Sequence, residues 1–346
     1  MSIPKLQSAK PDARSSRLKT RFIGDFEEIS RIFGQWDGRI EQISRGEFQG
    51  SAGIYPGTIV RAFRVETNQS LLTRGVDNAD FATIIPITPR NEGVLWRGRR
   101  LSPGQITIKG PKVEYYNQTA RGSIISGLLV PMPVLRQAAE QLGEFEIGDR
   151  LSSSKSLSPA PDKMHRFQQN LLRLLNPSCN VRESTVFSHR ETEQECLRWL
   201  IACLAGASQL ERLEVDRRQR LTLINRALEY MHASLDRPVT AQELCVLLGV
   251  NDRALRRLFK EFFGVGPVAY SRLLRLHAVR SHLKRAHGTG ATVAEIAPRC
   301  GFNRLGAFAR LYRTQFGELP SETLGVRGWP GIQQMTRERE PHPAKH

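Results

Sequence analysis

Two stretches near the carboxyl end decide the fold: residues 240–267 read TAQELCVLLGVNDRALRRLFKEFFGVGP, and residues 292–320 read TVAEIAPRCGFNRLGAFARLYRTQFGELP. The second stretch repeats the first at an offset of 52 residues, which becomes 53 after one inserted residue. The matched positions hold residue types that fix backbone geometry: Thr, Glu, Gly, Asn, aromatic residues and a final Pro. Such a repeat indicates one small folding unit that is used twice.

Each copy predicts a helix, a tight turn and a second helix. A Thr and a Glu three residues later predict a capping box at the first helix, a Gly predicts its left-handed end, and an Asn predicts the cap of the second helix. These residues are Thr240, Glu243, Gly249 and Asn251 in the first copy and Thr292, Glu295, Gly301 and Asn303 in the second. The sequence therefore predicts helix-turn-helix units over residues 240–263 and 292–316.

The second helix of each copy has a predicted inward face of apolar residues. These are Leu255, Leu258, Phe259 and Phe263 in the first copy and Phe308, Leu311, Tyr312 and Phe316 in the second. The opposite face of the first copy carries Arg253, Arg256, Arg257 and Lys260. Arginine can donate two parallel hydrogen bonds to guanine O6 and N7, or bind phosphate, in the major groove of DNA. The alternative is a basic face that is merely solvated. This explanation is poorer here, because the sequence has two such copies joined by a further basic helix.

Residues 268–286 predict that joining helix. Its basic residues Arg272, Arg275, Arg280, Lys284 and Arg285 are expected to face solvent or phosphate. A rigid spacer of this kind could hold two reading helices in successive major grooves, about 34 Å apart. Pro298 lies inside the first helix of the second copy, and we expect it to kink that helix or limit it to about one turn.

The charge of the chain points to an anionic partner. The sequence has 51 Lys and Arg against 34 Asp and Glu, for a net charge of +17, and residues 217–346 hold 22 of the basic and ten of the acidic residues. No stretch has the roughly 20 apolar residues that a membrane helix needs. A basic amphipathic helix can also lie on a membrane surface, but paired capped units have no use there, so we expect no membrane partner.

Histidine and cysteine are absent from the first 164 residues, because the first of each are His165 and Cys179. Their absence removes imidazole or thiolate metal sites and Ser-His or Cys-His nucleophile pairs from that region. The five cysteines are scattered, so we expect no metal site, no cofactor and a reducing cytoplasm. Cys196 and Cys203 share a helix face, which is typical of core or dimer-contact residues, with a redox switch as the alternative.

The rest of the chain predicts an α+β protein. Residues 39–130 contain short β-rich runs, typical of an antiparallel sandwich or small barrel, and helices are expected after Pro131 with a Ser- and Pro-rich loop over residues 151–161. The predicted domains are a flexible arm (1–20), a β-rich effector or dimerisation domain with C-terminal helices (21–215), an all-helical domain with the two helix-turn-helix units (216–326) and a polar tail (327–346).

The segment from about Leu223 to Leu324 resembles the DNA-binding domain of the AraC/XylS family of bacterial transcription regulators, which has two helix-turn-helix units. The ordered GF, F, Y, FG and P positions of the second copy carry the resemblance. The stretch GFNRLGAFARLYRTQFGELPSETL is also similar, more weakly, to the branch of ethanolamine-utilisation regulators. The resemblance implies an N-terminal β-rich domain that senses a small molecule or mediates dimerisation.

The same resemblance assigns roles to the reading helices. The base-facing positions are Arg253, Arg256 and Arg257 in the first unit and Leu305, Gly306, Ala307, Ala309 and Arg310 in the second. Leu305 and Ala307 can only touch a thymine methyl group or leave bases unread. We therefore expect the first helix-turn-helix unit to supply most base contacts. Phosphate contacts are expected from Lys260, Arg304 and Arg313, and also from Arg310 in addition to its base-facing position.

The leading interpretation is a non-enzymatic, sequence-specific transcription regulator. Expected partners are double-stranded promoter DNA and a small-molecule effector, with RNA polymerase and a second copy of the chain as further candidates. Two alternatives are a metabolite-transforming enzyme with a DNA-binding appendage and an architectural DNA protein without sequence preference. The effector site is unknown. The aromatic candidates, which are more typical of a core, are Tyr55, Phe81, Trp96, Tyr115 and Tyr116. The candidates for an anionic effector, which are more typical of a solvated loop, are Arg97, Arg99 and Arg100.

Overall fold

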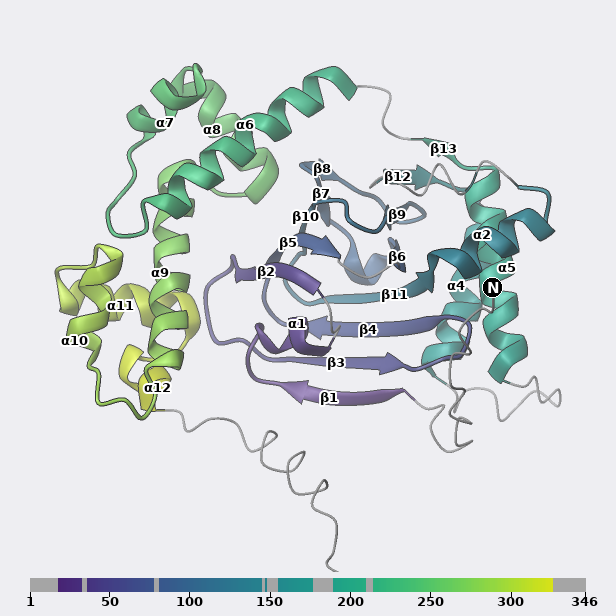
Figure 1. Ribbon diagram of the computed structural model, residues 1–346, viewed down its shortest axis with the longest axis horizontal. Helices are drawn as coiled ribbons and strands as arrows, with labels where there is room; N and C mark the ends of the chain where they lie inside the picture. Colours follow the sequence, from purple (N-terminus) through teal and green to yellow (C-terminus); the bar gives the residue numbers. More distant parts are fainter. Residues whose placement is uncertain are drawn as a thin grey trace, which may run out of the picture. The chain divides into compact units, whose positions relative to one another are not determined.

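A computed structural model describes residues 18–32, 36–77, 81–144, 147, 155–176, 189–209 and 214–325. These residues form two compact units. The first contains the described residues up to Ser44, Phe48–Leu221 and Glu261–Phe263, and the second contains Arg45–Glu47, Thr222–Lys260 and the described residues from Gly264 onward. Strands belong to the first unit, whereas the second is helical (Figure 1).

Two antiparallel sheets form the framework of the first unit (Figure 1). The larger sheet contains β1 (Lys19–Ile23), β3 (Gly50–Tyr55), β4 (Arg61–Thr67), β6 (Phe81–Pro86), β9 (Ile106–Lys109), β11 (Ser123–Pro131), β12 (Lys155–Ser158) and β13 (Ser208–Gln209). The smaller sheet contains β2 (Trp36–Gln42), β5 (Leu71–Asp77), β7 (Leu95–Trp96), β8 (Arg99–Arg100) and β10 (Tyr115–Gln118). The strand orders are β1-β3-β4-β11-β6-β9-β12-β13 and β2-β5-β10-β7-β8.

Three helices complete the main core of this unit: α2 (Met132–Gln141), α4 (Pro161–Leu175) and α5 (His189–Ala205). Ala62, Ile84 and Leu128 of the larger sheet share one buried cluster with Phe167 of α4 and Leu200 of α5. Burying a side chain such as Phe167 stabilises the fold by about 2 to 3 kcal/mol, so packing of these helices on the sheet contributes to the stability of the unit. The described part of this unit also contains the short helices α1 (Glu28–Ile32) and η1 (Pro89–Asn91).

A buried carboxylate ties α5 to the turn between β3 and β4. Glu193 is 2% exposed, and its Oε2 accepts hydrogen bonds from the backbone amides of Ile59 (2.6 Å) and Val60 (3.3 Å). Its Oε1 accepts from the Tyr55 hydroxyl (2.9 Å) and the Thr58 amide (3.3 Å). These donors offset the cost of burying the charge. Burial and the neighbouring carboxylate raise the pKa of Tyr55, which is a core residue rather than a surface ligand.

The regular elements in the described part of the second unit are helices; its segment Arg45–Glu47 is irregular. Its elements are α6 (Glu214–Ala233), which begins in the first unit, α7 (Ala241–Leu248), α8 (Asp252–Phe263), α9 (Pro267–Arg285), α10 (Val293–Ile296), the 3-10 turn η3 (Ala297–Cys300), α11 (Leu305–Phe316) and α12 (Pro320–Gly325). The predicted α+β class, with β-sheets and helices followed by two helix-turn-helix units, is confirmed. Across the described residues, no helix combines the length and the apolar character needed to cross a membrane.

The structure corrects three details of the first unit. The predicted loop over 151–161 contains a strand, because Lys155–Ser158 pairs with β9 and supplies the ladder hydrogen bonds that the sequence pattern did not show. The helices predicted after Pro131 are interrupted by a strand, because α5 ends at Ala205 and Ser208–Gln209 then pairs with β12. Lys19 and Thr20 of the predicted arm belong to β1, whereas the rest of the arm up to residue 17 and the tail 327–346 lie outside the described residues.

The cysteines that the structure describes are mostly buried. Cys196 and Cys203 belong to the main core of the first unit, as the core interpretation predicts. Burial raises the pKa of both thiols, for Cys203 to about 12, so they stay protonated and unreactive at neutral pH. Cys300 is also buried, whereas Cys245 on α7 is partly exposed.

Candidate nucleic-acid interface

The first helix-turn-helix unit consists of α7 and α8. Thr240 caps α7, where its side chain accepts from the Glu243 amide at 3.2 Å. Gly249 ends α7 at φ 66°, a left-handed conformation that an L side chain rarely adopts. Asn251 caps α8 by accepting from the Ala254 amide at 2.8 Å. These local contacts fix the direction in which α8 leaves the turn.

The second helix-turn-helix unit has the same order of elements, but its first helix is shorter. The Thr292 side chain accepts from the Glu295 amide (3.3 Å), and the Thr292 amide donates to Glu295 Oε2 (2.8 Å), which completes a capping box. These bonds lower the pKa of Glu295. The helix has a single α-helical turn before η3, which contains Pro298 and ends at Gly301 with φ 72°. Pro298 thus limits the helix as the sequence predicts.

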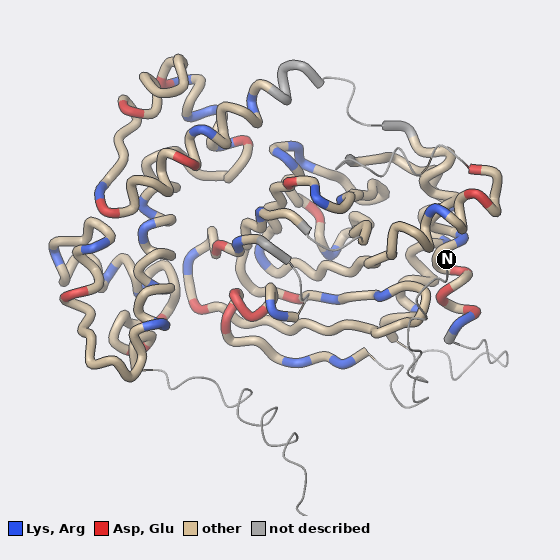
Figure 2. The backbone as a smooth tube through the Cα atoms, viewed as in Figure 1, with Lys and Arg blue, Asp and Glu red and all other residues tan. Residues whose placement is uncertain are grey.

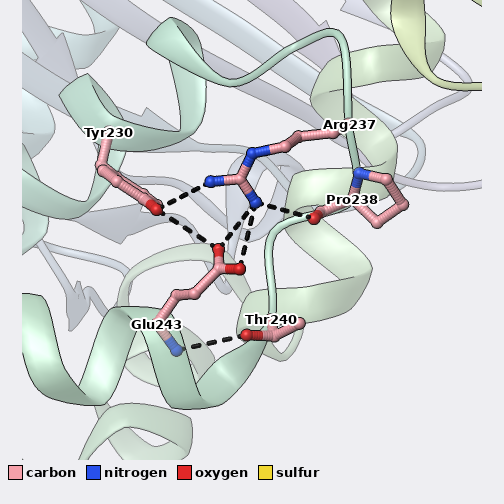
Figure 3. A network of polar contacts seen from close by, with 5 residues as sticks. All are labelled: Tyr230, Arg237, Pro238, Thr240 and Glu243. Atoms are coloured by element: carbon pink, nitrogen blue, oxygen red, sulfur yellow. Dashed lines mark hydrogen bonds and ion pairs between the residues drawn. The ribbon is translucent and has the colours of Figure 1, made fainter.

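Two of the predicted caps are wrong. Glu243 does not return to the Thr240 amide; its carboxylate accepts from Arg237 Nη1 at 3.0 and 3.1 Å and from the Tyr230 hydroxyl at 3.3 Å (Figure 3). Arg237 outcompetes the backbone amide because it offers a charged donor, and it lowers the pKa of Glu243. Asn303 is not the N-cap of α11, because the inserted residue moves the cap to Arg304, which makes no side-chain cap hydrogen bond.

Sequence reasoning missed the network around Arg237. Its Nη2 donates to the Tyr230 hydroxyl of α6 at 2.9 Å, and its Nη1 also donates to the Pro238 carbonyl at 3.4 Å (Figure 3). The network joins the end of α6 to the start of α7. The only available signal was the short spacing of one Arg and one Glu across a Pro-containing turn.

Helix α8 separates a buried face from a basic one. Its predicted inward residues are all at most 5% exposed: Leu255, Leu258, Phe259 and Phe263. Its exposed basic residues recur at helical spacing and are Arg253, Arg256, Arg257 and Lys260, and the acidic Asp252 at its start is exposed as well. Arg256 Nε contacts Asp252 Oδ2 at 2.6 Å, which leaves its two Nη groups to donate elsewhere. Among the described residues, Arg253, Arg257 and Lys260 have no acidic partner.

Helix α11 packs through an aromatic row. Phe308, Tyr312 and Phe316 are buried with successive ring centroids 5.6 and 4.7 Å apart, and Phe302 lies 5.0 Å from Phe308. Leu311, predicted to face inward, is 37% exposed, because the row at every fourth residue already fills the contact. The exposed residues at the start and along the outer face are Arg304, Leu305, Gly306, Ala307, Arg310 and Arg313.

Two arginines of α9 are buried, contrary to the prediction that they face solvent or phosphate. Arg275 is 7% exposed and donates to the Gly301 carbonyl (3.2 Å), with its guanidinium 4.7 Å from the Phe302 ring. Arg280 is 6% exposed, with its Nε 3.1 Å from Glu318 Oε1. Both arginines lie on the helix face that carries the buried residues of α9, and this helical spacing in the sequence could have indicated their burial. Their contacts join α9 to the second helix-turn-helix unit and to Glu318 just after it. Of the other predicted basic residues of α9, Arg272 and Arg285 are exposed and Lys284 is partly exposed.

Basic residues recur along the helices of the second unit, where the backbone at Lys and Arg is drawn in blue (Figure 2). The exposed ones that lie on the two reading helices form the candidate interface: Arg253, Arg256, Arg257 and Lys260 on α8, and Arg310 and Arg313 on α11 with Arg304 at its cap. An exposed guanidinium on a capped helix can donate to base edges or to phosphate oxygens.

The candidate effector residues of the first unit are mostly core residues. Trp96 stacks on Tyr115 with ring centroids 6.1 Å apart, and both are buried in a second cluster. Tyr116 is buried and donates to Glu114 at 3.0 Å, and Phe81 lies beneath the guanidinium of Arg61. Of the arginine cluster, Arg100 is exposed and Arg97 and Arg99 are partly exposed.

Known proteins resemble mainly the second unit. A family model described as a helix-turn-helix domain matches residues 244–325. The XylDLEGF operon transcriptional activator of Pseudomonas putida is 35% identical over 99 residues, which are 29% of this chain and 31% of that protein. The HTH-type transcriptional regulator GbdR of Pseudomonas aeruginosa is 28% identical over 174 residues, 50% of this chain and 43% of that protein. The chain thus spans between about a third and a half of the length of these relatives.

Two solved structures are also similar. The AraC-like transcriptional activator CuxR is 16% identical, with 82% of this chain and 99% of that chain covered and a TM-score of 0.41. A probable AraC family transcriptional regulator from Rhodopseudomonas palustris is 38% identical, with 30% of this chain and 94% of that chain covered and a TM-score of 0.28.

Proposed function

Because the C-terminal unit of this chain belongs to the AraC/XylS family of helix-turn-helix domains, we propose that the protein is a sequence-specific transcription regulator that binds promoter DNA through α8 and α11. The observation that carries the proposal is the stripe of Arg253, Arg256, Arg257 and Lys260 on α8. A helix with one face in an aromatic core and the opposite face covered by exposed guanidinium groups suits the major groove.

The exposed arginines divide into two proposed roles. Arg253, Arg256 and Arg257 lie in the first half of α8, and the first turns of a reading helix contact base edges. We assign these three to bases, with Arg310 as the base-facing arginine of α11. Lys260, Arg304 and Arg313 are assigned to phosphates, where they set affinity and register without reading sequence.

The proposal extends to control by a small molecule bound to the first unit. Among the described residues, the buried side-chain atoms on its strands that have no hydrogen-bond partner include Trp96 Nε1, Asn117 Oδ1 and Ser156 Oγ. Trp96 and Asn117 are directly paired across β7 and β10. Buried polar atoms without partners are costly, so a polar effector that satisfies them would be stabilised there. We assign residues 21–215 to effector binding and 216–326 to DNA binding.

The relatives suggest the direction of control. The Pseudomonas putida relative is named as a transcriptional activator, and we propose that this chain also activates transcription. Activation would make RNA polymerase a partner at the promoter, and a second copy of the chain would double the length of DNA that is read.

The test is selection of bound duplexes from a random library by the full chain, followed by affinity measurements on the selected and on scrambled DNA at physiological salt. A regulator should prefer the selected site by about 10³-fold or more. A ratio near one would identify an architectural DNA protein instead. Repeating the measurement with candidate polar metabolites tests the effector, which should change the affinity of the wild-type chain and not that of an Asn117→Leu variant.

A further inference from the structure

The start of α11 presents an apolar surface where a reading helix needs to meet bases. Leu305 is 41% exposed, and Gly306 and Ala307 are exposed beside it. The corresponding start of α8 carries Arg253 and Arg256. The two reading helices therefore offer different chemistry to DNA at equivalent places.

Packing of α11 against its core does not require Leu305, Gly306 or Ala307. Phe308, Tyr312 and Phe316 fill the contact between α11 and its core, and Tyr312 is fixed further by a 2.8 Å hydrogen bond between its hydroxyl and Thr323 Oγ1. A single exposed Leu is common on protein surfaces and decides nothing alone. The neighbouring glycine supplies the second observation.

Neither the backbone conformation nor the packing of the folded protein requires glycine at position 306. It lies within α11, its backbone is outside the left-handed region, and an added Cβ would meet nothing within 4 Å. Glycine weakens a helix relative to alanine, so the sequence accepts a loss at a position where alanine fits the folded protein. A partner that approaches the helix backbone closely would account for the missing methyl group.

The charges around this surface identify the partner as a polyanion. Arg304, Arg310 and Arg313 are exposed on the same element, and among the described residues no acidic side chain pairs with them. Such a frame fits the phosphates that flank a DNA groove and opposes docking of a basic protein surface. In the major groove, the apolar group that a base pair presents is the C5-methyl of thymine.

We propose that α11 reads its half-site through thymine methyl groups, with Leu305 and Ala307 in contact with the methyls and Gly306 allowing close approach to the groove. Arg304 and Arg313 hold the helix at the phosphates. The inference rests on the proposed function and specifies it: one half-site is read by hydrogen bonds from α8, and the other mainly by apolar contact from α11, next to the base-facing Arg310.

The direct test replaces thymine by uracil, one position at a time, in the site selected by the full chain. Uracil keeps the base-pairing groups and removes only the methyl. The half-site of α11 is identified as the one whose base preferences survive Arg257→Ala. There, one or two uracil positions should weaken binding about fourfold each, the factor expected for one buried methyl-sized group. Uracil in the half-site of α8 should have little effect.

Two variants link the effect to the named residues. Leu305→Ala should weaken binding to the thymine site and abolish the sensitivity to uracil at the position that Leu305 contacts. Gly306→Ala should raise the melting temperature by about 2 to 4 °C through helix propensity while it weakens DNA binding, a pair of opposite effects that a structural role cannot produce. Val246→Ala, at a 79% exposed residue of α7, is the matched control and should leave affinity unchanged.

The outcomes separate the two proposals. Specific binding that tolerates uracil throughout the α11 half-site, or Gly306→Ala that binds as well as the wild type, overturns the methyl-reading inference and leaves the regulator proposal standing. A chain that selects no sequence overturns the proposed function, and the inference with it. Loss of uracil sensitivity in Leu305→Ala, with Val246→Ala unchanged, supports both.

Discussion

Arginine serves two purposes in the second unit, and exposure separates them. Arg257 is exposed on α8, whereas Arg275 and Arg280 on α9 are buried against carbonyl, carboxylate and aromatic partners. A count of positive charges treats them alike. Only the exposed group can contribute to binding a polyanion, so mutational effects on affinity and on stability should divide along this line.

The contact classes predict different losses for two exposed arginines. Arg257→Ala should cost about 1 to 3 kcal/mol on the selected site and relax the preference at one base position, because it removes a bidentate base contact. Arg313→Ala should weaken all sequences alike and reduce the slope of log affinity against log salt by about one unit. Fluorescence anisotropy at several salt concentrations measures both. Equal losses on selected and random DNA for both variants would contradict the assigned roles.

The two turn glycines should differ in their tolerance of a side chain. At Gly249 an added Cβ meets nothing within 4 Å, so Gly249→Ala pays only the left-handed backbone cost of about 1 kcal/mol. At Gly301 the Cβ would lie 2.7 Å from the Asp236 carbonyl oxygen, so Gly301→Ala should cost about 2 to 4 kcal/mol. Urea unfolding measures the difference, and similar losses would show that the turn around Gly301 can relax.

At the scale of the element, the link between α6 and α7 predicts a pH dependence. The neighbouring Arg237 lowers the pKa of Glu243 below its usual value of 4.5. A carboxyl whose pKa is lower in the folded state stabilises the fold above its unfolded pKa, and this contribution is lost as the pH falls through the folded pKa. The urea midpoint of the wild type should therefore fall more steeply below pH 4.5 than that of Glu243→Gln.

The capping box provides a second test of the same linkage. Capping hydrogen bonds with Thr292 lower the pKa of Glu295 as well, so the urea midpoint of Glu295→Gln should also fall less steeply below pH 4.5 than that of the wild type. If the wild type and Glu243→Gln show the same pH profile, the network in Figure 3 contributes nothing to stability in solution.

Helix α9 should depend on its buried arginine for stability. Arg280→Ala leaves Glu318 without its partner and removes the guanidinium 5.3 Å from the Phe316 ring centroid, so we expect a loss of about 2 kcal/mol. DNA affinity of the folded protein should stay near that of the wild type. The matched control is Arg285→Ala on the exposed part of the same helix, which should leave stability unchanged. A variant that loses affinity but not stability would restore the phosphate role predicted from the sequence.

The elements that the sequence predicts well are those determined by neighbouring residues. Thr292 and Glu295, three residues apart, form their capping box, and Gly249 and Gly301 end their helices in the left-handed conformation. The features that the sequence does not predict are those that depend on residues far away in the chain. Arg275 finds the Gly301 carbonyl 26 residues away, and Lys155–Ser158 forms a strand because β9 is there to pair with it.

At the scale of the whole molecule, the chain has two cores that should unfold as separate transitions. Leu171 lies in the main core of the first unit, and Leu171→Ala should cost about 2 to 5 kcal/mol there. Gly301→Ala should affect the second unit alone. Calorimetry should therefore show each variant lowering a different transition. One cooperative transition lowered equally by both would show that the units fold together.

The candidate site was predictable from the sequence because the repeat placed Arg253, Arg256 and Arg257 on one face, and the structure leaves them exposed. The effector residues were not. Tyr55 and Trp96 are aromatic residues in strands, and sequence cannot tell a core ring from one that meets a ligand. The buried atoms without partners, on Asn117 and Ser156, emerge only when the strands are assembled.

The distribution of buried thiols gives the protein a ready-made reporter position. Cys196, Cys203 and Cys300 are enclosed, so among the cysteines that the structure describes only Cys245 on α7 is open to a maleimide dye. With Cys179 replaced by Ser, one fluorophore would attach at the first helix-turn-helix unit without any introduced cysteine. Its emission would follow occupancy of that unit in real time, and comparison with equilibrium binding would show which half-site engages first.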